Sequence, residues 1–250
     1  MEIIIKNVSF SHKKVNILKN IDMKINNGEF IGIVGCNGSG KSTLLKCIYK
    51  VLNVTDGEIF VDDKEINDYS RREFAKKIAV VTQHNNYQFD FSVKDIVLMG
   101  RAPYKKALEN DTKQDLEILE KALYDVGITH LIDRKYSTLS GGEQKRVVLA
   151  RALVQETDCI ILDEPTNHLD VTHQYKIMEL LKNIGKTTVV AIHDLNIAAR
   201  FCDRVYALKK GEIAGIGTPK ELFTRKWIKE IYDIDSEIII DKNEKMHILF

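Results

Sequence analysis

Residues 35–43 read GCNGSGKST and lie between an apolar run, FIGIV, and a periodic segment, LLKCIYKVL. They fit the pattern G-x-x-x-x-G-K-[ST], with Gly35, Gly40, Lys41 and Ser42 at the fixed positions. The apolar run is typical of a buried strand and the periodic segment of a helix, so the loop joins a strand to a helix. This context favours a phosphate-binding loop in an α/β protein over an ordinary glycine-rich turn.

The chemistry of such a loop depends on its backbone. Glycines let consecutive N–H groups turn inward around phosphate oxygens, and the following helix adds the positive end of its dipole. We expect the Lys41 ammonium to reach the β and γ phosphates of a nucleotide and the Ser42 hydroxyl to ligate Mg²⁺. The candidate nucleotide-contacting residues of the loop are Gly35, Cys36, Asn37, Gly38, Ser39, Gly40, Lys41, Ser42 and Thr43.

An acidic pair follows a second apolar run, CIILDE, at residues 159–164. We expect Asp163 to hold Mg²⁺ directly or through water, and Glu164 to polarise the attacking water as a general base. Such a pair alone usually marks only a strand that enters a loop. Together with the phosphate loop, it predicts hydrolysis of a nucleoside triphosphate.

Composition narrows the class of protein. The 250 residues carry 37 basic and 36 acidic side chains, so no overall basic field marks a nucleic-acid or anionic-membrane binder. The cysteines, Cys36, Cys47, Cys159 and Cys202, match no metal or redox spacing, which fits a reduced cytosolic protein. No secretory signal and no apolar segment of about 18 residues is apparent, so we expect another chain to cross any membrane at which this one works.

Short apolar runs alternate with helical patterns, which is typical of an α/β protein. Expected strands are residues 2–8, 29–35, 58–63, 78–83, 158–164, 187–193, 203–210 and 212–217, with two more in the tail 236–250. Between Ser92 and Ser137 strand signals vanish, and a capping box from Ser92 to Asp95 opens a helical pattern. We expect a helical subdomain, about residues 84–157, inserted in the α/β core.

A second pattern with two glycines, LSGGEQ, occupies residues 139–144 and opens a helix. Ser140 and Glu143 predict a capping box, worth about 1 kcal/mol, but a cap explains neither Gly141 nor Gly142. A glycine costs a helix interior about 1 kcal/mol against alanine, unless another group must approach a bare backbone. The pattern therefore predicts a second anion site at a helix N-terminus.

With these motifs the chain resembles, over nearly its full length, the nucleotide-binding subunit of an ATP-binding-cassette (ABC) transporter, whose signature is LSGGEQ. The resemblance implies a P-loop NTPase core with an N-terminal antiparallel β-subdomain and an inserted α-helical subdomain. It also implies that ATP and Mg²⁺ bind between two copies of the chain in a homodimer. The signature residues that would then act in trans are Ser140, Gly141, Gly142 and Gln144.

The same resemblance assigns roles to isolated residues. Gln83 matches the glutamine that senses the metal and water, Asp170 the residue that communicates across the dimer, and His193 the switch histidine on the γ-phosphate. Without the family, each Gln or His after a strand is read as a satisfied polar residue. The usual adenine-stacking aromatic is replaced by His12, with Phe10 as the alternative platform and an exposed turn as the plainer interpretation of His12.

The segment SVKDIVLMGRAPY resembles the corresponding segment of the ATPases that power uptake of iron-siderophore, haem and cobalamin chelates. In those ATPases the segment carries a Gly-Arg-x-Pro pattern, which residues 100–103 match here. This implies separate membrane permease subunits, indirectly a substrate-binding protein, no nucleic acid, and a peripheral place on the cytoplasmic face of the membrane. The nearby aromatics, Tyr87, Phe89, Phe91 and Tyr104, would form docking surface or ordinary core. An exporter ATPase and a soluble cassette protein of DNA repair, translation or iron-sulfur assembly stay open as alternatives.

Overall fold

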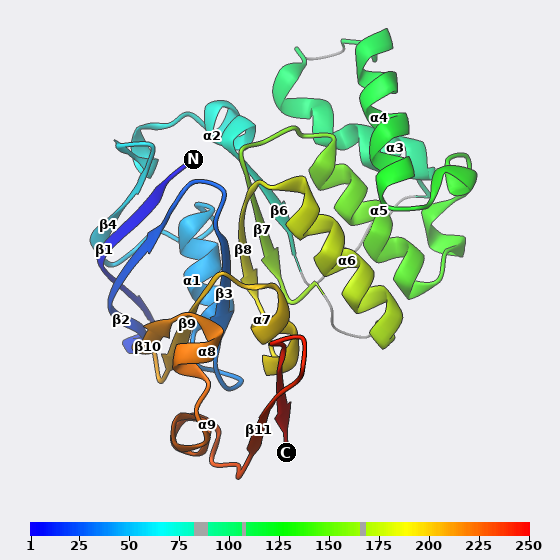
Figure 1. Ribbon diagram of the computed structural model, residues 1–250. Coiled ribbons are helices and arrows are strands. Elements are labelled where there is room, and N and C mark those ends of the chain that lie inside the picture. The colour runs from blue at the N-terminus through cyan, green and yellow to red at the C-terminus, as the bar shows by residue number, and fades with distance from the viewer. Residues whose placement is uncertain (83–89, 107–108, 166–168) are drawn as a thin grey trace. The chain divides into compact units, whose positions relative to one another are not determined.

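The computed structural model describes residues 1–82, 90–106, 109–165 and 169–250, which form two compact units (Figure 1). Unit 1 comprises Met1–Asp68 and Gly185–Phe250, and unit 2 comprises Tyr69–Ile184. The predictions that concern Gln83, Tyr87 and Phe89 lie outside the described residues.

Unit 1 begins with an antiparallel sheet in the order β2-β1-β4-β5. Its strands are β1 (Ile3–His12), β2 (Val15–Ile25), β4 (Asp56–Val61) and β5 (Lys64–Glu65), and the short 3₁₀ helix Ile66–Asp68 follows. The sequence reading did not anticipate β2. Toward its end buried and exposed residues alternate, so it never forms the continuous apolar run that revealed the other strands.

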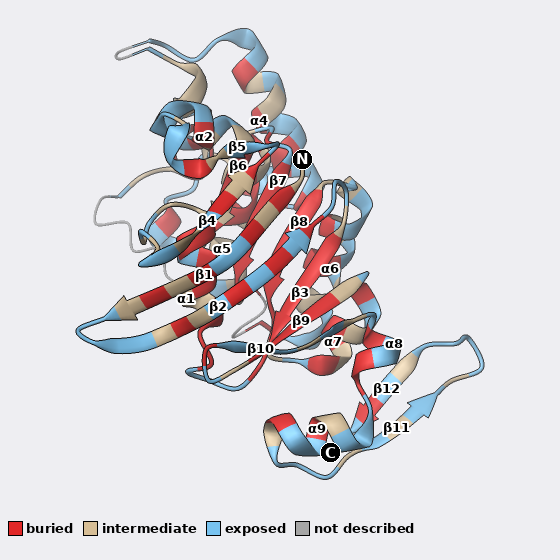
Figure 2. Ribbon diagram, turned by 90° about the vertical axis from the view of Figure 1, so that its left-hand side faces the viewer, coloured by how far each residue is buried: buried red, intermediate tan, exposed pale blue. Residues whose placement is uncertain are grey.

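The second sheet of unit 1 places four strands in the order β10-β9-β3-β8. They are β3 (Phe30–Val34), β8 (Thr187–Ala191), β9 (Arg204–Lys209) and β10 (Glu212–Gly217). Strand β3 runs parallel to β8 and β9, whereas β10 pairs with β9 as the expected hairpin. Every residue of β3 and β8 is buried (Figure 2), which explains the apolar sequence of β3 and the apolar end of β8 after Thr187 and Thr188.

A helix follows each of the strands β3 and β8. Helix α1 (Lys41–Ile48) comes after β3, and α7 (Leu195–Phe201) comes after β8. Because the carboxyl ends of parallel strands meet at one edge of a sheet, the loops 35–40 and 192–194 lie at the same edge. The register confirms this, since Ile33 pairs with Ala191 two residues before Gly35 and His193.

The tail of unit 1 contains two short helices and a hairpin. Helix α8 (Pro219–Leu222) starts with the predicted capping box of Thr218 and Glu221, and α9 (Arg225–Tyr232) follows. Strands β11 (Glu237–Ile240) and β12 (Met246–Leu249) pair antiparallel, as predicted. The Asn196 side chain holds β12 to α7, donating to Ile248 O at 3.0 Å and accepting from Ile248 N at 2.8 Å.

Unit 2 contains a parallel strand pair and a helical segment. The strands are β6 (Ile78–Val81) and β7 (Cys159–Asp163), and α2 (Arg71–Lys77) precedes β6. The other elements are α3 (Val93–Leu98), 3₁₀ helix η2 (Met99–Tyr104), α4 (Lys113–Asp125), the 3₁₀ helices Thr129–Leu131 and Tyr136–Thr138, α5 (Gly141–Leu153) and α6 (Val171–Ile184). The expected capping box of Ser92 and Asp95 begins α3.

Candidate nucleotide-binding site

The loop after β3 needs glycine at two positions for conformation and packing. Gly35 and Gly40 have φ angles of 145° and 108°, in the left-handed region that side chains disfavour. A Cβ on Gly35 would lie 2.2 Å from Leu208 O, and one on Gly40 would lie 2.9 Å from Leu18 Cδ2. The close approach of β9 and β2 to the loop therefore leaves no space for a side chain.

The same loop has the features of a phosphate cradle. Helix α1 has Gly40 as its N-cap and receives no side-chain cap, so its first N–H groups suit an anion. Lys41 is only 4% exposed, and its ammonium donates to Gly35 O at 2.8 Å and Cys36 O at 3.2 Å. Ser39 Oγ is buried without a hydrogen-bond partner among the described residues. The residues present thus fit the phosphates of a nucleotide.

The remaining loop residues differ in exposure. Cys36 and Asn37 are exposed at the tip of the loop, whereas Ser42 and Thr43 are half-buried in the first turn of α1. A hydroxyl at this position has the donor chemistry that Mg²⁺ accepts from Ser or Thr in such loops. No group of three or more metal-ligating side chains gathers elsewhere in the part of the chain that the structure describes.

The two candidates for an adenine platform lie on β1 in different surroundings. Phe10 is buried in the core of unit 1, so its ring offers no face to a ligand. His12 is exposed at the end of β1, opposite Val15 in the hairpin. Of the two, only His12 has a ring available for stacking.

The switch candidate His193 follows β8 at the same sheet edge as the loop. It is half-buried and precedes Asp194, whose carboxylate caps α7 by accepting from Asn196 N at 2.7 Å. His193 lines a pocket of about 480 Å³, whose other lining residues are Asp194, Leu195, Asn196, Tyr232, Ile234 and Phe250. The structure therefore brings the phosphate loop and His193 together within unit 1.

The acidic pair belongs to unit 2. Asp163 ends the fully buried strand β7, and Glu164 has a φ of 53°, which is uncommon for a residue with a side chain. Burial lowers the pKa of Lys145 on α5, while the Glu164 carboxylate acts in the opposite direction. The proximity of Lys145 to Glu164 was not predicted from the sequence, although Lys145 directly follows the signature.

The signature residues begin helix α5 as the sequence predicts. Ser140 is the N-cap, its N–H donates to Glu143 Oε2 at 2.8 Å, and its hydroxyl accepts from Glu143 N at 3.4 Å. Gln144 Nε2 donates to Tyr136 O and Leu139 O, both at 3.3 Å. The hydrogen bonds from Ser140 lower the pKa of Glu143, because they favour its charged form.

Neither signature glycine is required by the packing of unit 2. A Cβ on Gly141 would meet nothing within 4 Å, and one on Gly142 would meet only Leu169 Cδ2, at an ordinary 3.6 Å. This contrasts with Gly35 and Gly40, where a Cβ would clash. The bare backbone at the start of α5 therefore faces open space.

Asp170 has a local partner that the sequence reading did not identify. Its carboxylate accepts from His173 N at 2.9 Å and lies 2.7 Å from His173 Nδ1, at the start of α6. These hydrogen bonds from His173, the backbone one first, lower the pKa of Asp170. The exposed side chain of Asp170 therefore also caps a helix.

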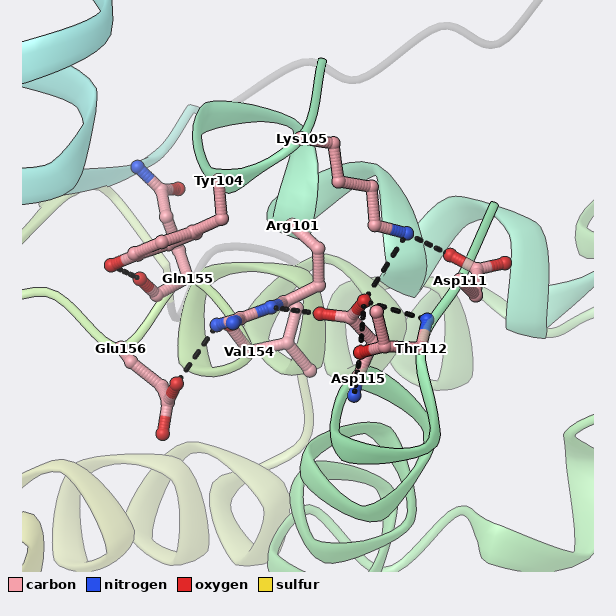
Figure 3. Close-up of polar contacts among 9 residues, drawn as sticks. All are labelled: Arg101, Tyr104, Lys105, Asp111, Thr112, Asp115, Val154, Gln155 and Glu156. Atoms are coloured by element: carbon pink, nitrogen blue, oxygen red, sulfur yellow. Dashed lines mark hydrogen bonds and ion pairs between the residues drawn. The ribbon is translucent and has the colours of Figure 1, made fainter. Parts of the chain in front are cut away.

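The Gly-Arg-Ala-Pro segment forms a buried charge cluster in unit 2 (Figure 3). Arg101 Nε donates to Asp115 Oδ1 at 2.8 Å, and Nη1 donates to Val154 O and Glu156 Oε2, each at 2.8 Å. The guanidinium also stacks on the Tyr104 ring, 4.2 Å from its centroid. Arg101 thus joins η2 to α4 and to the end of α5.

Two further observations explain this segment. A Cβ on Gly100 would lie 2.2 Å from Arg151 O, so only glycine lets η2 rest on the last turn of α5. Burial alone raises the pKa of Asp115, but hydrogen bonds from Thr112 and Arg101 outweigh it and hold that pKa well below its usual range. The pattern therefore has a structural role inside unit 2, and Tyr104 belongs to this cluster.

Within the described residues, no helix combines the length and apolarity that a membrane crossing requires.

The chain is similar to proteins of known families. The family model described as ABC transporter matches residues 18–167. The chain is 36% identical over 238 residues to the ferric enterobactin transport ATP-binding protein FepC of Escherichia coli (strain K12), covering 94% of this chain and 88% of FepC.

Two solved structures are similar over most of the chain. One is a metal-chelate type ABC transporter in an inward-facing conformation, with a TM-score of 0.85, 27% identity, and coverage of 99% of this chain and 96% of that chain. The other is a dimeric, post-hydrolysis ATP-binding cassette with bound ADP and Pi, with a TM-score of 0.77, 33% identity, and coverage of 87% and 98%.

These similarities confirm the expected P-loop NTPase fold with its β-subdomain and helical subdomain. The phosphate cradle, the buried acidic strand end and the open signature helix are the parts that an ATP-hydrolysing cassette needs. The chain belongs to the ABC transporter family and is an ATPase that couples ATP hydrolysis to transport.

Proposed function

We propose that two copies of this chain hydrolyse ATP head to tail and thereby power the import of a metal chelate through separate membrane permease subunits. The observation that carries the dimeric site is the start of α5, where the sequence has Gly141 and Gly142 although the packing would accept a Cβ at either position. Glycine there costs helix stability. The cost is understandable if the phosphates bound to a second copy must approach this backbone.

In the proposed site the phosphate loop holds the nucleotide. The Lys41 ammonium exchanges its loop carbonyls for the β and γ phosphates, and the amides of the loop and of α1 bind the oxygens. His12 stacks on the adenine. Ser42, Asp163 and Gln83 are the residues that would hold Mg²⁺, which would supply positive charge to offset that of the phosphates.

Hydrolysis depends on residues of both copies. Glu164 accepts a proton from the attacking water, and His193 positions the γ-phosphate. From the second copy, the Ser140 hydroxyl and the first amides of α5, which lack intrahelical partners, stabilise the charge that develops on the transferred phosphoryl group. Gln144 supports this corner by holding the carbonyls of Tyr136 and Leu139, and Asp170 links the two sites across the dimer.

The cargo and its direction are proposed from similarity. FepC is a ferric enterobactin transport protein, and the inward-facing neighbour is a metal-chelate type transporter. The chain shares the Gly-Arg-x-Pro segment expected of such importers. We place the working complex at the cytoplasmic face of the membrane, with a substrate-binding protein delivering an iron-siderophore, haem or cobalamin chelate to the permease.

Mixing two inactive variants tests the composite site. Lys41→Ala removes the phosphate ligand, and Ser140→Arg fills the signature corner, so each variant alone should be inactive. In a heterodimer the intact phosphate loop of the Ser140 variant faces the intact signature of the Lys41 variant, and one working site returns. Recovery of ATPase activity on mixing is expected. Activity that stays absent at every ratio, with both variants folded by circular dichroism, contradicts a site shared between two copies.

Co-purification separates transport from the alternatives. The chain expressed with its native membrane partner should copurify with a polytopic permease, and vesicles that enclose ATP, with the cassette on their inner face, should accumulate a ferric chelate added outside. ATP-driven movement in the opposite direction would instead indicate an exporter.

A further inference from the structure

The C-terminal end of α9 lies against the phosphate loop within unit 1. The Cys36 thiol donates to Ile231 O at 3.3 Å, and the Lys209 ammonium donates to Glu230 O at 2.6 Å. The last carbonyls of a helix have no intrahelical partners, so these two side chains cap the end of α9. Cys36 of the nucleotide loop thus caps a helix end at Ile231, which lies 195 residues further along the chain.

Tyr232, the last residue of α9, faces the same part of the loop. Its hydroxyl is buried and has no hydrogen-bond partner that meets ordinary geometry among the described residues. Burial raises the pKa of this hydroxyl, the Cys36 thiol raises it further, and the Gly35 N–H acts in the opposite direction. Because the Cys36 thiol donates to the carbonyl of Ile231, the next residue, Tyr232, lies beside the loop where it leaves β3.

A row of aromatic side chains packs against Tyr232. The Trp227 ring meets the Tyr232 ring edge-on, with centroids 6.2 Å apart, and Phe223 lies 5.6 Å from Trp227 on the other side. A Cβ on Gly215 would lie 3.1 Å from Trp227 Nε1, so the indole packs on the bare backbone of β10. Tyr232 is thus held on a rigid base.

Tyr232 also shares a pocket with His193, the residue proposed to position the γ-phosphate. It lines, with His193, the pocket of about 480 Å³ beside α7. The end of α9 is therefore adjacent to both elements of unit 1 that are proposed to contact the nucleotide phosphates. This segment lies beyond residues 18–167, which the family model matches.

We propose that Tyr232, together with the Ile231 carbonyl, is a positioning group that holds Gly35 and Cys36 in the conformation that binds phosphate. The proposal rests on the nucleotide site proposed above. Ordering one residue of backbone costs about 1–2 kcal/mol, so a loop already fixed by α9 binds ATP more tightly than a loop that must be ordered on binding. Nucleotide affinity is thereby coupled to the C-terminal segment.

The experiment uses the single tryptophan of the chain, Trp227, as its probe. ATP is titrated into the full chain while intrinsic fluorescence and, separately, the heat of binding are recorded. Because the Trp227 ring packs against the Tyr232 ring, a fluorescence change on ATP binding reports coupling between the loop and α9. Binding heat without any fluorescence change overturns the coupling.

Two pairs of variants test the contact itself. Cys36→Ala removes the donor to Ile231 O and Cys36→Ser keeps one; Tyr232→Ala removes the ring and Tyr232→Phe keeps it. We expect the two alanine variants to bind ATP about fivefold to thirtyfold more weakly than wild type, which corresponds to about 1–2 kcal/mol, and each conservative variant to bind ATP more tightly than its alanine counterpart.

Two control variants separate positioning from general loss of stability. Ile228→Ala opens a cavity under the buried face of α9 one turn before Tyr232, and Lys226→Ala changes the exposed face. Ile228→Ala should lower the melting temperature yet weaken ATP binding less than Tyr232→Ala does. If Cys36→Ala and Tyr232→Ala both bind ATP as tightly as wild type or more tightly, the positioning role is overturned, but the proposed nucleotide site is not. A wild-type chain that gives no binding heat with ATP overturns the nucleotide site as well.

Discussion

Cysteine reactivity at the level of single residues follows from burial. Cys36 is exposed in the phosphate loop, whereas Cys47, Cys159 and Cys202 are buried. Burial raises the pKa of Cys47 to about 11 and raises that of Cys159 as well. Since the thiolate is the reactive form, the buried thiols stay unreactive near neutral pH.

We therefore predict that a small alkylating agent labels Cys36 first and blocks ATP binding, and that ATP with Mg²⁺ protects it. Peptide mass spectrometry after brief labelling at pH 8 measures both effects. Equal labelling of Cys36 with and without nucleotide would count against its place beside the phosphates.

At the scale of elements, a substitution at the start of α5 should affect stability and ATPase activity differently. Gly142→Ala adds a methyl group that meets only ordinary contacts and favours the helix, so the free energy of unfolding should stay equal or rise by up to about 1 kcal/mol. ATPase activity should nevertheless fall, because the methyl group occupies the space reserved for the phosphates of the other copy. Urea unfolding and steady-state turnover test the pair of effects. A stable variant with full activity would contradict the role given to this glycine.

The cluster around Arg101 holds η2, α4 and α5 together, and its loss should be costly. Arg101→Ala leaves the buried Asp115 carboxylate without its guanidinium, which costs about 3–5 kcal/mol of unfolding free energy at pH 7. Because the folded-state pKa of Asp115 lies below its usual value, the charged pair stabilises the fold above about pH 4 and loses this effect as pH falls. The difference between variant and wild type should therefore be full at pH 7 and smaller at about pH 3.

An exposed ion pair is the matched control for this measurement. Lys113 and Glu117 form such a pair on α4, so Lys113→Ala should cost less than about 0.5 kcal/mol at either pH. A loss at Arg101 no larger than that at Lys113 would show that the cluster does not hold the helical segment.

For the whole molecule, the proposed cycle predicts a trapped dimer. Glu164→Gln keeps the shape of the side chain but removes the base, so the variant should bind ATP, hydrolyse it at least about a hundredfold more slowly, and accumulate as a dimer. Size-exclusion chromatography with and without ATP measures the association. The exposed Glu179→Gln on α6 is the control and should behave like wild type. A fully active, monomeric Glu164 variant would refute both the base and the shared site.

Features encoded by neighbours in sequence were predictable. The phosphate loop, the buried strand ending in Asp163 and the caps at Ser140 and Thr218 each need only a few consecutive residues, and the structure has them as predicted. Strand β2 was missed because its apolar residues alternate with polar ones. The chemical roles of the site residues stay predictions.

Contacts between distant residues were not predictable, because no local pattern encodes them. Arg101 reads as a marker of one class of importer, yet its partners Asp115 and Glu156 lie 14 and 55 residues away. The bond from Cys36 to Ile231 spans most of the chain. Such pairings arise only when the sheet and its covering elements are assembled.

Glu164 adopts a left-handed backbone conformation that asparagine and glycine tolerate better, at a cost of about 1 kcal/mol or more. The general-base role proposed for the carboxylate gives a reason to keep glutamate at this strained position. A library screened for heat tolerance alone should accordingly enrich glycine or asparagine at this codon, while one screened for growth on scarce iron should retain glutamate.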